Sequence, residues 1–262
     1  MGLREAMTHR PWPVPDGPWI MEQTWHNLLF AHWPVPVAAL RALVPAGLTI
    51  DTFGGQAWLG VIAFRLTGIR LRGTPPLPGV SRFPEINLRT YVTCGGKPGV
   101  LFLSMDADNR LGIALARPWF RLPYCRAAIR FAAGPDGVAM TCRRTEPGAP
   151  PAQFVAHYGP AGPVGRAAPG SLAAWLTERY CYYSADGRGR LARCEIAHPP
   201  WPLQVAAAQI GANTLAAAVG LPAPAGPPLL HYAHRIRAVI WPVRRVTDRS
   251  LAGAHRAAPI PG

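Results

Sequence analysis

Pro84-Glu85-Ile86-Asn87-Leu88-Arg89-Thr90-Tyr91-Val92 alternates polar and apolar side chains, and this period of two predicts a β-strand. Successive side chains of a strand point to opposite faces, so Glu85, Asn87 and Arg89 share one face. A solvated polar face is the ordinary expectation for an arbitrary hairpin. Asparagine is depleted in strands, however, and an asparagine between a glutamate and an arginine favours a polar interior.

The paired glycines Gly95-Gly96 predict a tight hairpin turn, followed by a second strand over 100–107. A two-residue turn sets Cys94 opposite Lys97 and fixes three pairs further along the hairpin: Arg89–Phe102, Asn87–Ser104 and Glu85–Asp106. Met105 falls on the apolar face in this register. Two opposed carboxylates in a low-dielectric cavity do not both ionise easily, so we expect one of Glu85 and Asp106 to stay protonated as a general acid. Arg89 is then expected to contact Glu85, Asp106 or a water in the cavity, and to bind a carboxylate or enolate oxygen of a ligand.

Composition narrows the class of protein. The net charge is +14, but nearly all basic residues are arginines scattered along the chain, so nucleic-acid binding is not expected. The five cysteines show no C-x-x-C spacing, which argues against a disulfide framework and a structural zinc site. Without an apolar signal core or a long apolar run, we expect a cytoplasmic protein that does not bind membranes.

The order of predicted elements favours an α+β fold, an antiparallel sheet or barrel with short peripheral helices, because strands and short helices follow no regular βαβ alternation. One domain is expected over 19–248, between flexible tails at 1–18 and 249–262 that carry no function. Helices are predicted at 37–44, 110–117 (capped by Asp108-Asn109 and ended by Pro118), 171–180 and 213–219, and a loop at 146–170.

Five ordered motifs between about residues 22 and 243 carry a resemblance: Asn27-Leu-Leu-Phe-Ala-His-Trp-Pro, Phe83-Pro-Glu-Ile-Asn-Leu-Arg-Thr-Tyr-Val, Leu122-Pro-Tyr, Glu178-Arg-Tyr and His198-Pro-Pro-Trp-Pro-Leu-Gln. With them the chain resembles the YqjF-like family of uncharacterised bacterial proteins. That family looks like a distant branch of the acetoacetate decarboxylase-like superfamily. The resemblance implies a cone-shaped antiparallel β-barrel with its site inside.

The resemblance also bears on mechanism, because the decarboxylases form a Schiff base through an activated lysine. The matching positions hold Tyr124 and Cys125 here. The chain's single lysine, Lys97, falls in the Gly-Gly turn, where we expect it to be solvated. The resemblance thus implies that the acidic residue Glu85 is kept while Schiff-base decarboxylation is lost.

Two functions remain open at this stage. The first is a lysine-independent enzyme that acts on a small oxo-acid or polyketide-like carbonyl compound by acid/base steps such as enolisation, dehydration or cyclisation. The second is a non-catalytic protein that binds or senses a hydrophobic acid. The catalytic candidates are Glu85, Asp106 and Arg89, and the expected substrate-binding residues are Asn87, Ser104, Arg117, Tyr124, His198 and Trp201. The His198-Pro-Pro-Trp201 turn suits a pocket lip and a structural corner equally. No metal or cofactor is expected, and a homo-oligomer is left open.

Overall fold

The computed structural model describes residues 7–76 and 78–247, which form a mostly β structure with a few short helices. The strands are β1 (Met21–Val35), β2 (Thr49–Ile50), β3 (Ala57–Leu71), β4 (Phe83–Cys94), β5 (Lys97–Ala107), β6 (Tyr124–Gly134), β7 (Gly137–Arg144), β8 (Gln153–Pro160), β9 (Cys181–Ala185), β10 (Leu191–Ala197), β11 (Leu203–Asn213), β12 (Leu229–Ile240) and β13 (Arg244–Arg245). The helices are α2 (Val37–Leu40), α3 (Arg110–Phe120) and α4 (Leu172–Thr177), with 3₁₀ turns η1 (Arg41–Leu43) and η2 (Ala217–Val219). Within these residues, no helix has the length and apolar character needed to cross a membrane.

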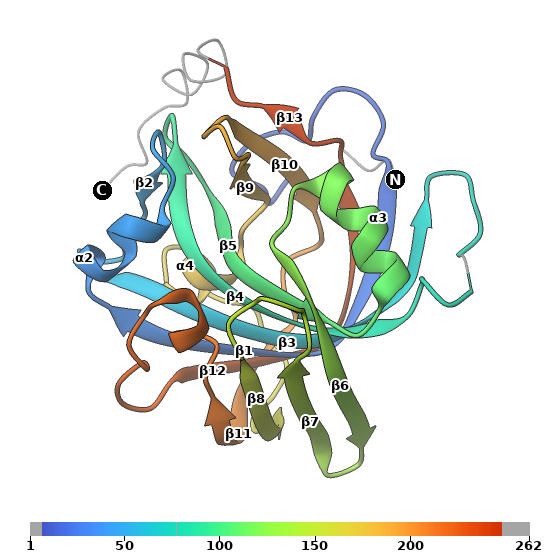
Figure 1. The fold of residues 1–262 in the computed structure, drawn as a ribbon, viewed down its shortest axis with the longest axis vertical. Helices are drawn as coiled ribbons and strands as arrows, with labels where there is room; N and C mark the ends of the chain where they lie inside the picture. Colours follow the sequence, from blue (N-terminus) through green and yellow to red (C-terminus); the bar gives the residue numbers. More distant parts are fainter. Residues whose placement is uncertain (1–6, 77, 248–262) are drawn as a thin grey trace.

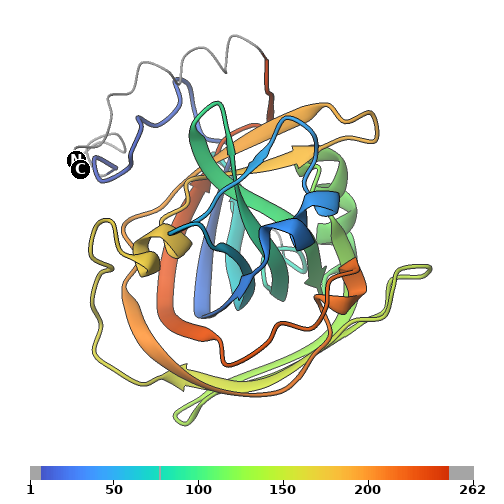
Figure 2. The same cartoon turned by 90° about the vertical axis from the view of Figure 1, so that its left-hand side faces the viewer.

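The sheet closes into rings, because β5 pairs with β4, β6 and β9 while β12 pairs with β1, β10 and β11. One ring passes through β1, β3, β4, β5, β9, β10 and β12. The other replaces β9 and β10 with β6, β7, β8 and β11. In Figure 1, β9 and β10 lie above the central strands β1, β3 and β4, and β6, β7, β8 and β11 lie below them. Figure 2 shows the sheet curving back on itself.

The central strands are buried on both faces, which explains their long apolar runs. Alternate residues of β1 and β3, such as Leu29 and Val61, pack with Met140 and Phe154 in a core on the side of β6, β7 and β8. The intervening residues, such as Phe30 and Phe64, pack with Trp201 on the other side. Each face of these strands therefore borders a different interior.

The expectation of a purely antiparallel sheet is wrong at two places, where β5 pairs in parallel with β6 and with β9. A parallel pair needs a crossover connection. Helix α3 provides it between β5 and β6, and in Figure 1 it lies beside these strands.

The β4–β5 hairpin keeps the predicted register only near its turn. Cys94 pairs with Lys97 and Arg89 with Phe102, as expected, but the register shifts between Arg89 and Leu88. Leu103 is the extra residue of this β-bulge.

Beyond the bulge the predicted pairs are wrong: the structure pairs Leu88 with Ser104, Asn87 with Met105, Ile86 with Asp106 and Glu85 with Ala107. Because strand side chains alternate, one extra residue turns every later side chain to the opposite face. Met105 thereby joins the face of Glu85 and Asn87. Ser104 and Asp106 move to the other face.

Helix α3 begins as predicted, with the Asn109 side chain accepting a hydrogen bond from the Gly112 N–H, but it runs through Pro118 to Phe120. A proline removes one backbone donor and strains the preceding turn. Phe120 is buried and its carbonyl accepts a hydrogen bond from the Tyr182 hydroxyl at 3.0 Å, so the last turn is held by packing and capping.

Of the remaining local predictions, one helix is confirmed, and a loop and a second helix are not. Helix α4 lies within the predicted 171–180 segment and is capped by Ser171. The predicted loop 146–170 instead contains β8, which pairs with β7 and β11. Of the predicted helix 213–219 only η2 is present, since β11 extends to Asn213.

The N-terminal segment from residue 7 packs on the domain, although its composition predicted a free tail. Arg10 and Trp12 both donate hydrogen bonds to Glu195 of β10, each at 3.1 Å, and Val14 is buried. A buried carboxylate that needs donors explains why this proline-rich segment is held. The predicted C-terminal tail 249–262 lies outside the described residues.

Candidate active site

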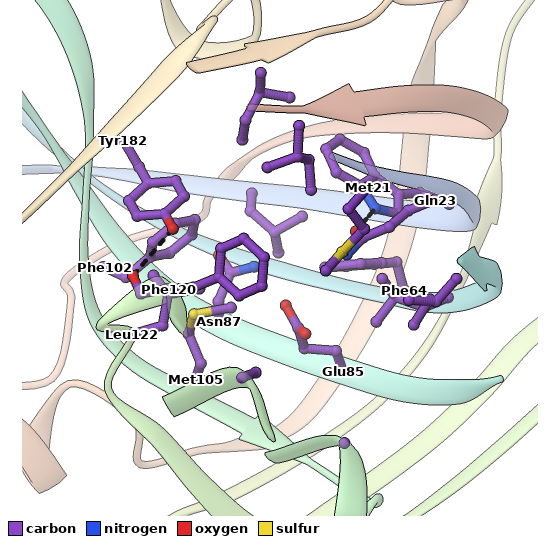
Figure 3. Close-up of a pocket in the computed structure, with 18 of the residues that line it drawn as sticks. Met21, Gln23, Phe64, Glu85, Asn87, Phe102, Met105, Phe120, Leu122 and Tyr182 are labelled. Atoms are coloured by element: carbon purple, nitrogen blue, oxygen red, sulfur yellow. Dashed lines mark hydrogen bonds between the residues drawn. The ribbon is translucent and has the colours of Figure 1, made fainter. Parts of the chain in front are cut away.

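A cavity of about 490 Å³ lies inside the ring that includes β9 and β10. Side chains from β1, β3, β4, β5, β9, β10 and β12 form its walls, and the inner face of α3 closes one side. Figure 3 shows the Glu85 carboxyl group pointing into the space that Phe64, Met105 and Phe120 border.

The cavity gathers six of the nine residues that the sequence proposed as a site: Glu85, Asn87, Arg89, Tyr124, His198 and Trp201. Ser104, Asp106 and Arg117 are not among its lining residues. Strand alternation predicted the shared face of Glu85, Asn87 and Arg89 correctly, because β4 is regular over these positions.

Glu85 is 2% exposed and accepts a hydrogen bond at Oε2 from the Tyr124 hydroxyl at 2.9 Å. Burial raises the pKa of Glu85 from its ordinary value of 4.5 to about 7, against the lowering effect of hydrogen bonds from Tyr124 and Asn87. The charge of Asp106 adds a smaller upward contribution to this pKa. Both protonation states of Glu85 are therefore populated near neutral pH, as proton transfer requires.

Arg89 is the cation closest in sequence to Glu85 on the same strand face. Its Nη2 donates to the Leu176 carbonyl at 3.3 Å, and its guanidinium lies 5.8 Å from the Phe30 ring centroid and 5.6 Å from that of Tyr91. Its Nε is buried without a hydrogen-bond partner in the described chain. The expected contact with Glu85 or Asp106 is not among these interactions, and carbonyl and ring contacts stand in its place.

Three arginines line the cavity, and they differ in their partners. Arg70 pairs with Glu22 at 3.1 Å and Arg179 pairs with Asp51 at 2.6 Å. Across residues 7–76 and 78–247, no carboxylate lies within ion-pair distance of Arg89. Arg89 is thus the lining cation with charge left to balance, which suits it to an anionic ligand group.

Asn87 lies between the two charged residues and is 4% exposed. Its amide supports the Glu85 carboxylate, while its Oδ1 is buried without a hydrogen-bond partner in the described residues. An amide oxygen in this state accepts a hydroxyl or amine donor from a ligand.

Asp106 is fully buried but belongs to the opposite face of the hairpin. Its two carboxylate oxygens accept hydrogen bonds from Nε and Nη2 of Arg144, both at 2.7 Å. Such a bidentate ion pair ties β5 to β7. The predicted opposition of Glu85 and Asp106 is therefore wrong, because the bulge at Leu103 separates them.

Two further residues hold positions that the sequence did not predict. Arg117 lies outside the cavity, where its Nη2 pairs with Glu146 at 3.0 Å and donates to the Tyr124 carbonyl at 2.7 Å. Lys97 is not solvated: its Nζ pairs with Glu195 at 2.7 Å and lies 4.4 Å from the centroid of Trp12. It is not among the lining residues of the cavity.

The His198-Pro-Pro-Trp201 turn is both a cavity wall and a structural corner. His198 and Trp201 line the cavity, while the Trp201 indole donates to the Thr177 carbonyl at 2.8 Å and its backbone N–H donates to Glu178 at 2.9 Å. Burial lowers the pKa of His198, so its imidazole is neutral near pH 7.

Several lining residues carried no usable signal in the sequence, among them Gln23, Met105, Phe120 and Tyr182. Met105 was assigned to the wrong face, and Phe120 lies beyond the proline at which α3 was expected to end. Trp119 of α3 also lines the cavity.

The fold matches that of acetoacetate decarboxylase-like enzymes. The structural match to acetoacetate decarboxylase from Legionella pneumophila covers 94% of this chain and 95% of that enzyme, with a TM-score of 0.58 and 12% sequence identity. The enduracididine biosynthesis enzyme MppR complexed with pyruvate covers 92% and 98%, with a TM-score of 0.59 and 14% identity. An acetoacetate decarboxylase-like enzyme from Sphingomonas wittichii RW1 covers 88% and 94%, with a TM-score of 0.56 and 17% identity.

Sequence comparison places the chain more narrowly. The model of the DUF2071 family, described as an uncharacterized conserved protein, matches residues 22–237. The protein YqjF of Bacillus subtilis (strain 168), itself uncharacterized, is 47% identical over 243 residues, 93% of this chain and 99% of that protein. The chain belongs to the DUF2071 family.

Proposed function

We propose that this protein is an acid–base enzyme that acts on a small oxo-acid or polyketide-like carbonyl compound without a lysine Schiff base. Glu85 moves the proton, and Arg89 holds the acid group or the enolate oxygen of the substrate. The observation that carries the proposal is the pairing, on one face of β4, of a carboxyl whose pKa lies near 7 with an arginine that has no carboxylate partner in the described chain.

The chemical step is proton exchange next to a carbonyl. The C–H bond α to the carbonyl breaks, its proton goes to the Glu85 carboxylate, and the electron pair moves onto the carbonyl oxygen as an enolate that Arg89 stabilises. Protonated Glu85 exchanges its proton with solvent and then delivers a proton to the same carbon, which restores the carbonyl. No lysine lines the cavity, and Tyr124, which occupies a position that matches a decarboxylase lysine, supports Glu85.

Asp106 is left out of this mechanism because Arg144 binds both of its oxygens. This loss favours a second candidate, a protein that binds or senses an acid, because one carboxyl and one arginine suffice for recognition. The pyruvate complex of MppR, a protein of similar fold, supports an oxo-acid in either case.

The test follows proton exchange in D2O. We expect the protein to exchange the α-hydrogens of some members of a panel of 2-oxo and 3-oxo acids, detected by NMR, and Glu85→Gln to lower the rate by about 10²- to 10⁴-fold. Glu22→Gln is the matched control: Glu22 is also a buried glutamate but is not among the lining residues of the cavity, and it is paired with the lining residue Arg70 and with Arg237.

Three outcomes separate the candidates. Exchange that is lost in Glu85→Gln and kept in Glu22→Gln supports the enzyme. Tight binding of an acid with no exchange supports the sensor. Neither binding nor exchange across the panel overturns both.

A further inference from the structure

Three of the large apolar side chains that line the cavity also meet solvent, and together they are called the apolar rim. Leu71, Leu115 and Trp119 are between 41% and 59% exposed, and all three line the cavity. They come from the end of β3 and from α3, which lie on the same side of the molecule in Figure 1. Burying such side chains in contact with a ligand is favourable, and exposing them is not.

The inner wall behind this apolar rim is shaped by small residues. Gly112 and Ala116 line the cavity one helical turn apart on α3, on the side that faces the interior. The rim residue Leu115 precedes Ala116 directly, and Phe120 follows one turn later. The helix thus offers a shallow apolar path from the rim toward the interior.

The polar residues of the cavity are much more deeply buried than the apolar rim. Glu85 and Asn87 are 2% and 4% exposed, whereas the rim residues are largely open to solvent. The cavity also has a volume of about 490 Å³, within the range of about 300–1,000 Å³ that drug-sized ligands occupy. A four-carbon oxo-acid leaves most of this space unfilled.

We infer that the substrate is amphiphilic, with an oxo-acid head held at Glu85 and Arg89 and an apolar chain that leaves the cavity between α3 and the end of β3. The inference rests on the proposed function for the head and on the apolar rim for the tail. A substrate tail fits the rim better than a partner surface does, because the rim residues are continuous with the cavity wall.

The test is a chain-length series of straight 2-oxo acids, from pyruvate to about twelve carbons, titrated calorimetrically into the full chain. Each buried methylene is expected to tighten binding about fourfold until the tail reaches solvent. The double variant Leu115→Gln with Trp119→Gln should flatten this series for the longer acids and leave pyruvate binding unchanged.

Leu111→Gln is the matched control, because Leu111 is as exposed as Trp119 and lies on the same helix but is not among the lining residues. It should leave the whole series unchanged. A wild-type series that is flat, or a series that the double variant does not alter, overturns the tail.

Head and tail fail separately in this design. If straight-chain alcohols show the same slope and bind as tightly as the acids, and Arg89→Met changes nothing, the proposed function fails while the apolar path stands. If pyruvate binds and depends on Arg89 but added methylenes have no effect, the head stands and the tail is overturned. Two other results would assign the rim to a partner surface and overturn the proposed substrate tail. The first is a dimer, seen by light scattering, that Trp119→Gln dissociates. The second is binding to phosphatidylcholine vesicles that this variant loses.

Discussion

Glu85 and Asp106 are two buried carboxylates of one hairpin with opposite surroundings. Asp106 accepts two charge-assisted hydrogen bonds from Arg144, whereas the hydrogen bonds to Glu85 come from neutral groups, the Tyr124 hydroxyl and the Asn87 amide. Burial raises the pKa of Glu85 to about 7 because no cation offsets the cost of desolvation. Both carboxyl groups are buried, so their hydrogen-bond partners decide that Asp106 stabilises the fold and that Glu85 is available for proton transfer.

The largest expected effect is on the free energy of unfolding, and it tests the structural role of Asp106. Asp106→Asn leaves the Arg144 guanidinium buried without its anion, which should lower the free energy of unfolding by about 3–5 kcal/mol. Urea unfolding followed by circular dichroism measures it. Replacing the pair by apolar residues, Asp106→Leu with Arg144→Met, should recover most of the loss. A cost below about 1 kcal/mol for Asp106→Asn would break the comparison, since the pair would then contribute no more than a surface ion pair does.

The next prediction concerns the pH dependence of stability at Glu85. Its pKa is raised in the folded protein, from 4.5 to about 7, so the folded state binds more protons than the unfolded chain between these values. The stabilising contribution of protonated Glu85 is complete below about pH 4.5 and is lost as the pH rises through about 7. Relative to wild type, Glu85→Gln should therefore gain up to about 3 kcal/mol across this window, at about 1.4 kcal/mol per pKa unit.

Glu22→Gln provides the control for that measurement. Burial alone would raise the pKa of Glu22, but hydrogen bonds from Arg237 and Arg70 lower this pKa below its ordinary value. The stabilisation that Glu22 gives the folded state is therefore present above the pKa of the unfolded chain, and it is lost only as the pH falls below that pKa. The stability difference between Glu22→Gln and wild type should be flat between about pH 5 and 8. A flat difference for Glu85→Gln as well would show that Glu85 does not titrate in this window.

These contrasts also show how far the sequence leads. Strict alternation over 84–92 and the glycine pair predicted β4, the turn and the shared face of Glu85, Asn87 and Arg89, because each is a local property of the chain. The acetoacetate decarboxylase-like fold followed from the ordered motifs and is confirmed by the structural neighbours.

The bulge at Leu103 lay beyond that reach. The run Leu101-Phe102-Leu103 is apolar throughout, so no break in alternation and no glycine marks the extra residue. The partner of Asp106 is 38 residues away on β7, and pairings at such distances depend on how the rings close. Because of this one extra residue, Met105 lies on the face of Glu85, where the sequence predicted Asp106.

A moderate effect is expected at Arg89, on the functional side of the comparison. Arg89→Lys keeps the charge but loses the planar fork, which should weaken binding of a 2-oxo acid by about 1–3 kcal/mol without affecting the fold. Arg89→Met should weaken it further. Calorimetric titration measures both, with Arg70→Lys as the control because Arg70 lines the cavity but is paired with Glu22. If Arg89→Met unfolds the protein while Arg89→Lys binds normally, Arg89 is a structural brace.

The smallest expected effect isolates the hydrogen bond that distinguishes Glu85 from Asp106. Tyr124→Phe removes the donor at 2.9 Å, and because this hydrogen bond lowers the pKa of Glu85, its loss should raise that pKa further. A net hydrogen-bond contribution of about 0.5–1.5 kcal/mol corresponds to an upward shift of about one pH unit or less in the midpoint of the α-proton exchange rate. Tyr182→Phe is the matched control, since Tyr182 also lines the cavity but donates to the Phe120 carbonyl. A downward shift in Tyr124→Phe, or an equal shift in both variants, would mean that Glu85 is tuned by the cavity as a whole and not by its tyrosine partner.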